Sequence, residues 1–481
     1  MNNDLSAEAD RADLLFLKSA MTLEGAFWTL EQVLHWVNEQ NKKVTVNVNN
    51  RSIKALSGWG FDTSSGRLCH ETGKFFSIDG IKVTTNWNGP KEWRQPIINQ
   101  PEVGFLGIIT KEFKGVLHFL LQAKIEPGNI PYVQLSPTLQ ATRSNYTQVH
   151  KGREPLYLDY FRKAQPAQIL LDQLQSEQGA RFFRKRNRNI ILKLEEDIEE
   201  RDQFLWLTLG QIKTLMQYDG LINMDTRTVI SCISFGNHQP GIIDLIDFLA
   251  HDHKLYPSKR AILESALTVN TGKHSTAEII TFLTKLKSMY DLEVERVPLS
   301  SLPDWIIDED AIRHRDNQYF KVIGVDVEIG NREVMKWSQP MIEPAQEGLC
   351  AFILKNINGL LHFAVQAKLE CGNLDIVEFA PTVQCLTGNY RRTATGALPF
   401  LDYVLSAGPD QILFDTLQSE EGGRFYREQN RNLLVLAGDE IPEELPPRYI
   451  WMTLNQLQNF LKFNNYLNIQ ARSLIAALSF V

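Results

Sequence analysis

The stretch Gly115–Tyr146 decides the fold; its sequence is GVLHFLLQAKIEPGNIPYVQLSPTLQATRSNY. Its first half alternates, as in a strand whose side chains point to opposite faces in turn. One face is wholly apolar, and the other carries the polar side chains of His118, Gln122, Lys124 and Glu126. The turn-forming residues 127–129 end this strand, and a second extended segment follows. The stretch therefore predicts paired strands with one face in a core and one polar face.

A second copy of this stretch occupies Gly359–Tyr390, with the sequence GLLHFAVQAKLECGNLDIVEFAPTVQCLTGNY. Between residues 118–146 and 362–390, 14 of 29 positions are identical without a gap. The His, Gln, Lys and Glu of the polar face all return at the same spacing, with Lys368 in the place of Lys124. Such self-similarity indicates a tandem duplication.

Matched segments continue on both sides of these stretches, so the duplication covers nearly the whole chain. Thr29-x-x-Gln32 and Ser275-x-x-Glu278 are both capping-box patterns, which predict helix starts at matching points. We predict repeat one at 10–236, a linker at 237–255 and repeat two at 256–481. Helical and strand patterns mix without strict alternation, which predicts α+β units, each built on a mixed sheet.

Composition narrows the class of protein. The 481 residues carry a formal net charge of -7, which argues against broad nucleic-acid binding. The five cysteines form no C-x-x-C pair, which favours reduced thiols in a cytoplasmic protein over a disulfide framework or a zinc site. The first residues are polar and acidic, unlike a signal peptide, and no apolar run approaches the roughly 20 residues of a membrane span.

Several motifs together resemble one enzyme family, the NDP-hexose 2,3-dehydratases. These motifs are Trp93-x-Gln-Pro, Gln100-Pro-Glu-Val-Gly, Leu117-His-Phe, Gln122-Ala-Lys-x-Glu-Pro-Gly-Asn, Leu135-Ser-Pro-Thr-x-Gln, Ser144-Asn-Tyr and Gln175-Ser-Glu-Gln-Gly. The resemblance implies two Nudix-like α/β sandwich domains in each chain and a homodimer. It also implies a dTDP-4-keto-6-deoxyhexose substrate, with the chain acting as a lyase in deoxysugar biosynthesis.

The Nudix resemblance suggests a further alignment. In Nudix hydrolases one helix ends in Gly and holds a divalent metal through glutamates, and the nearest matches here are Asp172–Gly179 and Asp415–Gly422. These segments are predicted to be helices, but two of the three acidic ligand positions are changed. We therefore expect a site that binds no metal and does not hydrolyse pyrophosphate. We expect no redox cofactor either, since the oxidation at C3 offsets the loss of oxygen at C2.

Removing water across C2 and C3 of a 4-keto sugar calls for three groups: a base at C3, a donor facing O4, and an acid for the C2 hydroxyl. The polar strand face offers Lys124 for O4 or a phosphate, and Glu126 as the base. His118 is a further catalytic candidate. The alternatives are a surface Lys, a turn carboxylate paired with that Lys, and a core histidine.

The segments that follow the strand offer further candidates. Tyr146 is a candidate donor to O4 or to the leaving hydroxyl, against a buried core Tyr. Six residues are candidates for sugar or nucleotide contacts: Gln122, Gln140, Ser144, Asn145, His150 and, in repeat two, Asn389. Lys368 and Tyr390, the counterparts of Lys124 and Tyr146, are substrate-binding candidates in repeat two.

A basic cluster follows the predicted helix in each repeat. Arg181 and Arg188 recur as Arg424 and Arg431, and arginine forks match the geometry of a diphosphate. The alternative is a solvated charged turn. Repeat one has five basic residues in RFFRKRNRN, against three in RFYREQNRN of repeat two, which favours repeat one as the working site. Either pocket could also borrow loops from its neighbour.

Three functions compete for this pattern. The resemblance favours a sugar-nucleotide lyase. A Nudix-type hydrolase of nucleotide sugars needs the acidic metal ligands that the aligned segments lack. A non-catalytic sugar-nucleotide-binding module would use the polar face for recognition alone.

Overall fold

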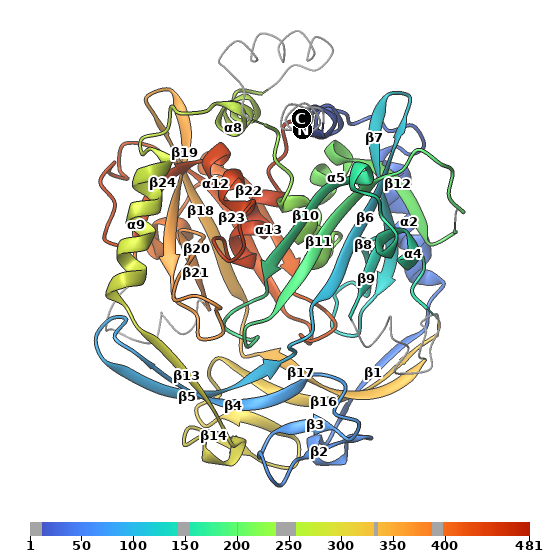
Figure 1. The fold of residues 1–481 in the computed structure, drawn as a ribbon, viewed down its shortest axis with the longest axis vertical. Coiled ribbons are helices and arrows are strands. Elements are labelled where there is room, and N and C mark those ends of the chain that lie inside the picture. The colour runs from blue at the N-terminus through green and yellow to red at the C-terminus, as the bar shows by residue number, and fades with distance from the viewer. Residues whose placement is uncertain (1–11, 143–153, 200, 237–255, 331–334, 387–397) are drawn as a thin grey trace.

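A computed structural model describes residues 1–481 except 1–11, 143–153, 200, 237–255, 331–334 and 387–397. The two repeats lie side by side above a layer of smaller sheets (Figure 1). Among the described residues, no helix has both the length and the apolar character needed to cross a membrane.

A seven-stranded mixed sheet forms the body of repeat one. Its strands follow the order β10-β11-β6-β7-β12, with β8 paired to β7 and β9 paired to β6. Only β6 and β11 run parallel. The strands are β6 (Gly104–Phe113), β7 (Val116–Ile125), β8 (Val133–Pro137), β9 (Leu139–Ala141), β10 (Ile169–Ser176), β11 (Arg186–Lys193) and β12 (Phe204–Thr208).

Repeat two contains the same sheet, in the order β20-β19-β18-β23-β22 with β21 and β24 on β18 and β19. Its parallel pair is β18 and β23, the counterparts of β6 and β11. The strands are β18 (Gly348–Ile357), β19 (Leu360–Lys368), β20 (Glu378–Ala380), β21 (Val383–Leu386), β22 (Ile412–Ser419), β23 (Gln429–Ala437) and β24 (Tyr449–Thr453). The prediction of a duplicated α+β unit on a mixed sheet is confirmed.

The two smaller sheets exchange strands between the repeats. In one, β1 of repeat one pairs with β16 of repeat two, beside β14, β15 and β17. In the other, β13 of repeat two pairs with β4 of repeat one, beside β2, β3 and β5. Their strands are β1 (Val46–Arg51), β2 (Trp59–Phe61), β3 (Leu68–His70), β4 (Ser77–Thr85), β5 (Lys91–Asn99), β13 (Leu292–Val297), β14 (Trp305–Ile307), β15 (Ala311–His314), β16 (Phe320–Ile329) and β17 (Lys336–Pro344). Each small sheet is therefore complete only when both halves of the chain are present.

Helices begin where the caps predict. Thr29 and Ser275 form complete capping boxes at the starts of α2 and α9, which confirms both predicted helix starts. The helices are α2 (Leu30–Lys42), α4 (Leu158–Arg162), α5 (Leu209–Leu215), α6 (Met224–Ser231), α8 (Pro257–Leu267), α9 (Thr276–Met289), α11 (Leu401–Leu405), α12 (Leu454–Leu461) and α13 (Ile469–Ala476). Helices α6 and α13 are wholly buried and pack against each other at the centre of the molecule.

Two fully buried arginines join the repeats at this centre. Arg227 of α6 donates to Ser473 Oγ and to the carbonyl of Ser419, both in repeat two. Arg472 of α13 makes the reciprocal contacts, donating to Thr228 Oγ1 at 3.1 Å and to the carbonyl of Ser176. Since a buried charge is costly unless it is hydrogen-bonded, each repeat satisfies a group that the other buries.

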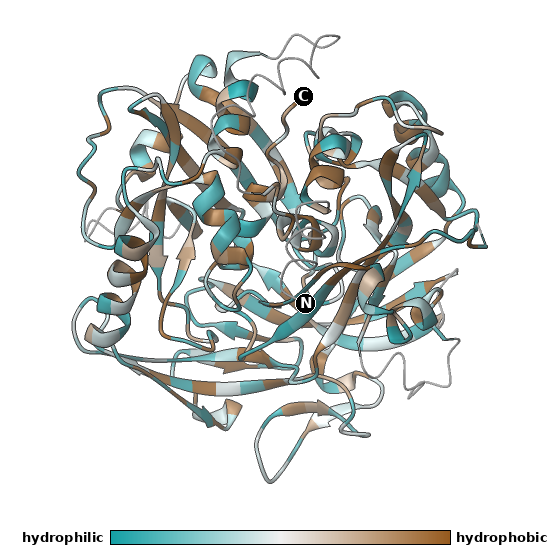
Figure 2. Ribbon diagram, turned by 45° about the horizontal axis from the view of Figure 1, so that its top comes forward, coloured by the Kyte–Doolittle hydropathy of each residue, from teal (hydrophilic) through white to brown (hydrophobic). Residues whose placement is uncertain are grey.

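The strand that opens the duplicated stretch has the predicted two faces. Leu117, Phe119 and Leu121 are fully buried in the largest core cluster. On the opposite face Leu120 packs in a separate cluster, whereas Gln122 and Lys124 are only half-buried. Figure 2 shows apolar segments along the strands of the large sheets, where these cores lie.

The predicted helices over 172–179 and 415–422 are wrong. Strands β10 and β22 occupy most of these segments, and each pairs with its neighbour in register, as Asp172 does with Ile190. Leucine and glutamine favour helices in isolation, but pairing with the central strands satisfies the backbone here. The alignment with the Nudix metal helix therefore fails, and so does the argument about metal that rested on it.

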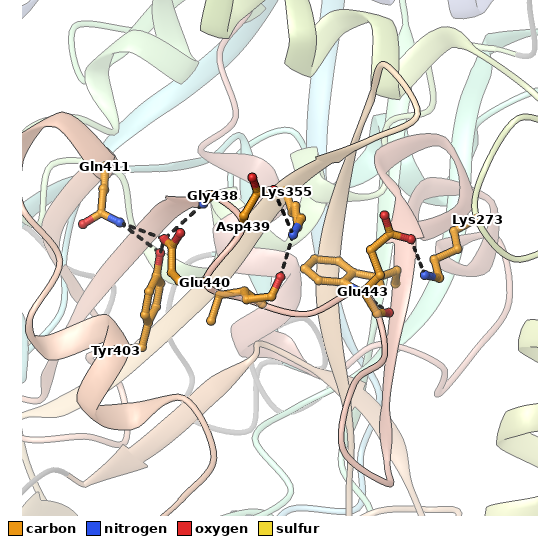
Figure 3. Close-up of polar contacts among 10 residues, drawn as sticks. Lys273, Lys355, Tyr403, Gln411, Gly438, Asp439, Glu440 and Glu443 are labelled. Atoms are coloured by element: carbon orange, nitrogen blue, oxygen red, sulfur yellow. Dashed lines mark hydrogen bonds and ion pairs between the residues drawn. The ribbon is translucent and has the colours of Figure 1, made fainter.

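A polar network closes the outer end of repeat two (Figure 3). Lys355 donates to the carbonyl of Ile441 at 2.6 Å, Tyr403 donates to the Glu440 carboxylate, and Lys273 pairs with Glu443 at 2.7 Å. These contacts hold the 438–443 loop, and Ile441 of that loop is buried in the adjacent core cluster. We assign this network a structural role, because none of its members lines the cavity described next.

Candidate active site

A cavity of about 860 Å³ lies between the large sheet of repeat one and the exchanged small sheets. Its wall includes the ends of β7 and β9 and the start of α6, all from repeat one. Repeat two contributes β16, β17 and the loop that bears Arg424. Aromatic side chains from both repeats line it as well: Trp59, Phe75, Phe76 and Trp337. A single site is therefore built from both halves of the chain, as one of the sequence hypotheses allowed.

Lys124, Gln140 and Glu126 form one hydrogen-bonded chain along this wall. Lys124 Nζ donates to the Gln140 carbonyl at 3.2 Å, and Gln140 Nε2 donates to Glu126 Oε1 at 2.7 Å. Glu126 is only 4% exposed, and all three residues line the cavity. The structure thus brings together three of the predicted site residues: the backbone carbonyl of Gln140 holds the cation, and its side-chain amide holds the carboxylate.

Positive charge enters the cavity from two loops. Arg424, from repeat two, lies 4.1 Å over the Phe76 ring and donates to Gln100 Oε1 at 3.2 Å. Lys185, from repeat one, is 5% exposed and donates to the Glu102 carbonyl. Burial lowers the pKa of Lys185, although neighbouring carboxylates oppose this shift.

Two acidic residues that the sequence did not single out, Asp225 and Glu421, also line the cavity. Burial, followed by the charges of Glu421 and Glu126, holds the pKa of Asp225 well above its usual range. Burial and the neighbouring Glu177 raise the pKa of Glu421 to about 7. The sequence does distinguish these two residues, because their counterparts in the other repeat are neutral. Gln470 corresponds to Asp225, and Gln178 corresponds to Glu421.

Two candidates from the polar strand face do not line this cavity. His118 is 1% exposed; its Nε2 accepts from the Ala26 amide at 3.0 Å, and its Nδ1 lies 2.8 Å from the Val116 carbonyl. Both ring nitrogens are thus engaged by backbone, as in the core-histidine alternative. Gln122 donates to the Pro137 carbonyl at 2.9 Å and so supports the pairing of β7 with β8.

Three of the four predicted arginines lie elsewhere. Arg188 forms a two-pronged pair with Asp172 at 2.5–2.7 Å, and Arg431 does the same with Asp415 at 2.6–2.8 Å. Arg181 lies 4.2 Å over Phe320, in the position that mirrors Arg424. Arg188 and Arg431 are thus held by carboxylates of their own sheets, whereas the loop after β10 crosses to the other repeat and brings Arg181 to the neighbouring sheet.

Repeat two keeps the hydrogen-bonded chain and changes what surrounds it. Lys368 donates to the Gln384 carbonyl at 2.8 Å, and Gln384 donates to Glu370 at 2.9 Å. There, however, Asn468 donates to Gln384 Oε1 at 2.7 Å. In repeat one, by contrast, Gln140 Oε1 is buried without a partner among the described residues. The counterpart of Lys185 is the acidic Glu428.

Six predicted site residues fall outside the described residues: Ser144, Asn145, Tyr146, His150, Asn389 and Tyr390. Their roles stay predictions. Thr142 and Pro155, which lie on either side of residues 143–153, both line the cavity.

Comparison with known proteins now identifies the family. The model of the family described as NDP-hexose 2,3-dehydratase matches residues 30–233 and again 276–478. The chain belongs to the NDP-hexose 2,3-dehydratase family. A member from Saccharopolyspora spinosa is 42% identical over 99% of this chain and 98% of its own length. One from Amycolatopsis orientalis is 40% identical over 98% and 94%. Both are named dTDP-4-dehydro-6-deoxy-alpha-D-glucopyranose 2,3-dehydratase. The resemblance inferred from the motifs is confirmed, and the two matches correspond to the two repeats.

Proposed function

We infer that this chain is a sugar-nucleotide lyase that removes water across C2 and C3 of a dTDP-4-keto-6-deoxyhexose. The product is a dTDP-3,4-diketo-2,6-dideoxyhexose, an intermediate for deoxysugar biosynthesis. Relatives with this activity in their names align over more than nine-tenths of both chains. The observation that carries the proposal at the site is the Lys124–Gln140–Glu126 chain, which faces a cavity large enough for a sugar nucleotide.

We propose a β-elimination with named roles. The C3 proton is acidic because the C4 carbonyl accepts the electron pair as an enolate. Glu126 takes this proton, and Lys124 stabilises the charge that develops on O4. The carbonyl then re-forms as the C2–O bond breaks. The resulting enol becomes the 3,4-diketone, and no net oxidation is needed.

The cationic loops suit the diphosphate. Arg424 is anchored on Phe76 and Gln100 and lines the cavity, where its guanidinium group suits a phosphate oxygen. Lys185 lies at the same cavity. The aromatic side chains in the wall are suited to stack with a nucleobase.

Incubation with dTDP-4-keto-6-deoxyglucose tests the function. The expected product has lost the mass of one water, and a 3-ketoreductase added to the reaction traps the labile diketone. Adding EDTA separates the alternatives, since a Nudix-type hydrolase loses activity and releases a sugar phosphate. Binding without turnover would support the non-catalytic module instead.

We also propose, from the resemblance, a homodimer, a cytoplasmic location and a Nudix-like ancestry for each repeat. The mixed sheet with a buried helix against it is compatible with that ancestry. Light scattering of the purified protein measures the oligomer directly, and a mass of 55.0 kDa would contradict the dimer.

A further inference from the structure

Asp225 occupies an unusual position in the wall of the cavity. It is the second residue of α6, whose N-cap Asn223 accepts from the Thr226 amide at 2.8 Å. Asn223 also donates to Ser136 Oγ at 2.7 Å, which fixes the start of the helix against β8. Because β8 pairs with β7, the strand that bears Lys124, the position of Asp225 is set by the same sheet.

The carboxyl of Asp225 is buried and uncommitted. The residue is 3% exposed, and among the described residues its side chain takes part in no hydrogen bond or ion pair. Buried carboxylates are normally paired, so a carboxyl that faces a cavity without a partner is available to a ligand.

The charges that face Asp225 come from several elements. Glu126 and Lys124 lie at the end of β7, Glu421 lies on the loop from repeat two, and Glu177 follows β10. Burial is the largest cause of the raised pKa of Asp225, and the three carboxylates add to it, whereas Lys124 opposes it. This surrounding charge and the burial favour the protonated form of Asp225 more than they would for an exposed carboxyl.

The other repeat supplies a natural comparison. The Lys–Gln–Glu chain is present in both repeats, but Gln470 stands at the position of Asp225. An amide can donate and accept hydrogen bonds, but it cannot act as an acid. The repeat whose Lys–Gln–Glu chain lines the 860 Å³ cavity is thus the one with a carboxyl at this position.

We propose that Asp225 is the general acid of the dehydration, which protonates the C2 hydroxyl as it leaves. This proposal rests on the proposed function. When the enolate collapses, the C4 carbonyl re-forms, the C2–C3 double bond forms, and the C2–O electron pair leaves with oxygen. That oxygen takes the proton of Asp225 and departs as water.

The proton balance closes within the site. After elimination Asp225 is a carboxylate, and Glu126 holds the proton from C3. Glu126 returns that proton to C2 of the enol, and Asp225 takes the proton of the C3 hydroxyl, which leaves the 3,4-diketone. Both side chains are then back in their starting states, without an external acid or oxidant.

The test compares two leaving groups in the full-length enzyme. Asp225→Asn should lower kcat for water loss by about 100-fold or more, in the range typical of general acids. Fluoride needs no proton to leave, so the same variant should eliminate fluoride from the 2-deoxy-2-fluoro analogue within about tenfold of the wild-type rate. Gln470→Asn is the matched control and should leave both rates unchanged. Equal losses on both substrates, or full activity of Asp225→Asn, would overturn the proposal.

A second measurement needs no variant and covers the case in which Asp225→Asn does not fold. In the wild-type enzyme, kcat/KM for water loss should fall on the alkaline side as the acid loses its proton. The fluoro analogue should lack this limb. Coincident pH profiles for the two substrates would overturn the role of Asp225. The proposed function fails separately, if the wild-type enzyme converts neither substrate.

Discussion

In the proposed mechanism, Lys124 stabilises the negative charge that develops on O4. A donor at O4 gains strength as the enolate forms, so its loss should lower kcat more than it raises KM. Removing one such donor typically costs about 100- to 1000-fold, and we expect Lys124→Met to lower kcat by at least about 100-fold. Lys368→Met, in the other repeat, should cost less than about tenfold. Steady-state kinetics of both variants check this, and the reverse pattern would move the active site to repeat two.

The two mirrored arginines should differ in the same way. Arg424 lines the cavity, whereas Arg181 lies over Phe320 near the other repeat. Loss of a charge-assisted hydrogen bond costs roughly 1.5–3 kcal/mol, so Arg424→Ala should raise KM by about ten- to 100-fold. Arg181→Ala should change KM by less than about threefold. Calorimetric titration of both variants with dTDP provides an independent check. Equal losses of affinity in the two variants would contradict the assignment of Arg424 to the diphosphate.

The buried carboxyl of Glu421 predicts a pH-dependent stability. Its pKa rises from 4.5 to about 7 through burial, so the folded state holds this proton more tightly than the unfolded state. The contribution is complete below about pH 4.5 and is lost as pH rises through about 7. Glu421→Gln should therefore melt like the wild type at pH 5 and at a higher temperature at pH 8. A difference in melting temperature between variant and wild type that stays constant from pH 5 to pH 8 would contradict this. The control is Glu443→Gln, which alters an exposed ion pair.

Local patterns predicted some elements and missed others, for identifiable reasons. The alternation in β7 and the capping boxes of α2 and α9 depend on neighbours in sequence, and these predictions are confirmed. Strand β10 contains good helix formers, and only its pairing with β11 makes it a strand. Similarly, Lys124 and Glu126 follow from strand spacing, but the approach of Arg424 follows from strand exchange, which no local pattern reveals. Asp225 could have been found from the contrast with Gln470.

The turn after each polar strand docks tightly on the opposite repeat. A Cβ at Gly128 would lie 1.7 Å from the Phe425 carbonyl oxygen, and one at Gly372 would lie 1.8 Å from that of Phe182. Gly128→Ala and Gly372→Ala should each destabilise the fold, by roughly 1–3 kcal/mol for overpacking.

The two substitutions should differ in how strongly they affect the active site. Gly128 contacts the loop that carries Glu421 and Arg424 into the cavity, so Gly128→Ala should also lower kcat/KM by about tenfold or more. Gly372→Ala should lower kcat/KM by less at a temperature where it is folded, because the loop that docks on Gly372 carries Lys185 to the cavity, whereas the loop on Gly128 carries both Glu421 and Arg424. Thermal melts with parallel kinetics test the pair, and equal activity losses would contradict the link between this turn and the site.

At the scale of the molecule, the duplication produced one interdependent unit. The buried arginines, the exchanged strands and the docked turns all cross between the repeats. This arrangement lets the copies diverge in function while they stay similar in fold. One copy lines the cavity with Lys124, Glu126 and Asp225, and the other contributes Arg424 and Glu421 to the same cavity.

Dividing the chain tests this interdependence. Residues 1–245 alone would leave β4 without β13 and Arg227 without Ser473, and residues 246–481 alone would leave β16 without β1. An exposed sheet edge and an unpaired buried arginine both oppose folding. We therefore expect neither fragment to show a cooperative melt by itself, whereas the two fragments produced together should assemble and recover dehydratase activity.

A fragment that melts cooperatively alone would mean that the large sheet of one repeat is sufficient for folding. The strand exchange would then be a late docking step, and activity should still require both fragments, because Arg424 and Lys124 come from different halves.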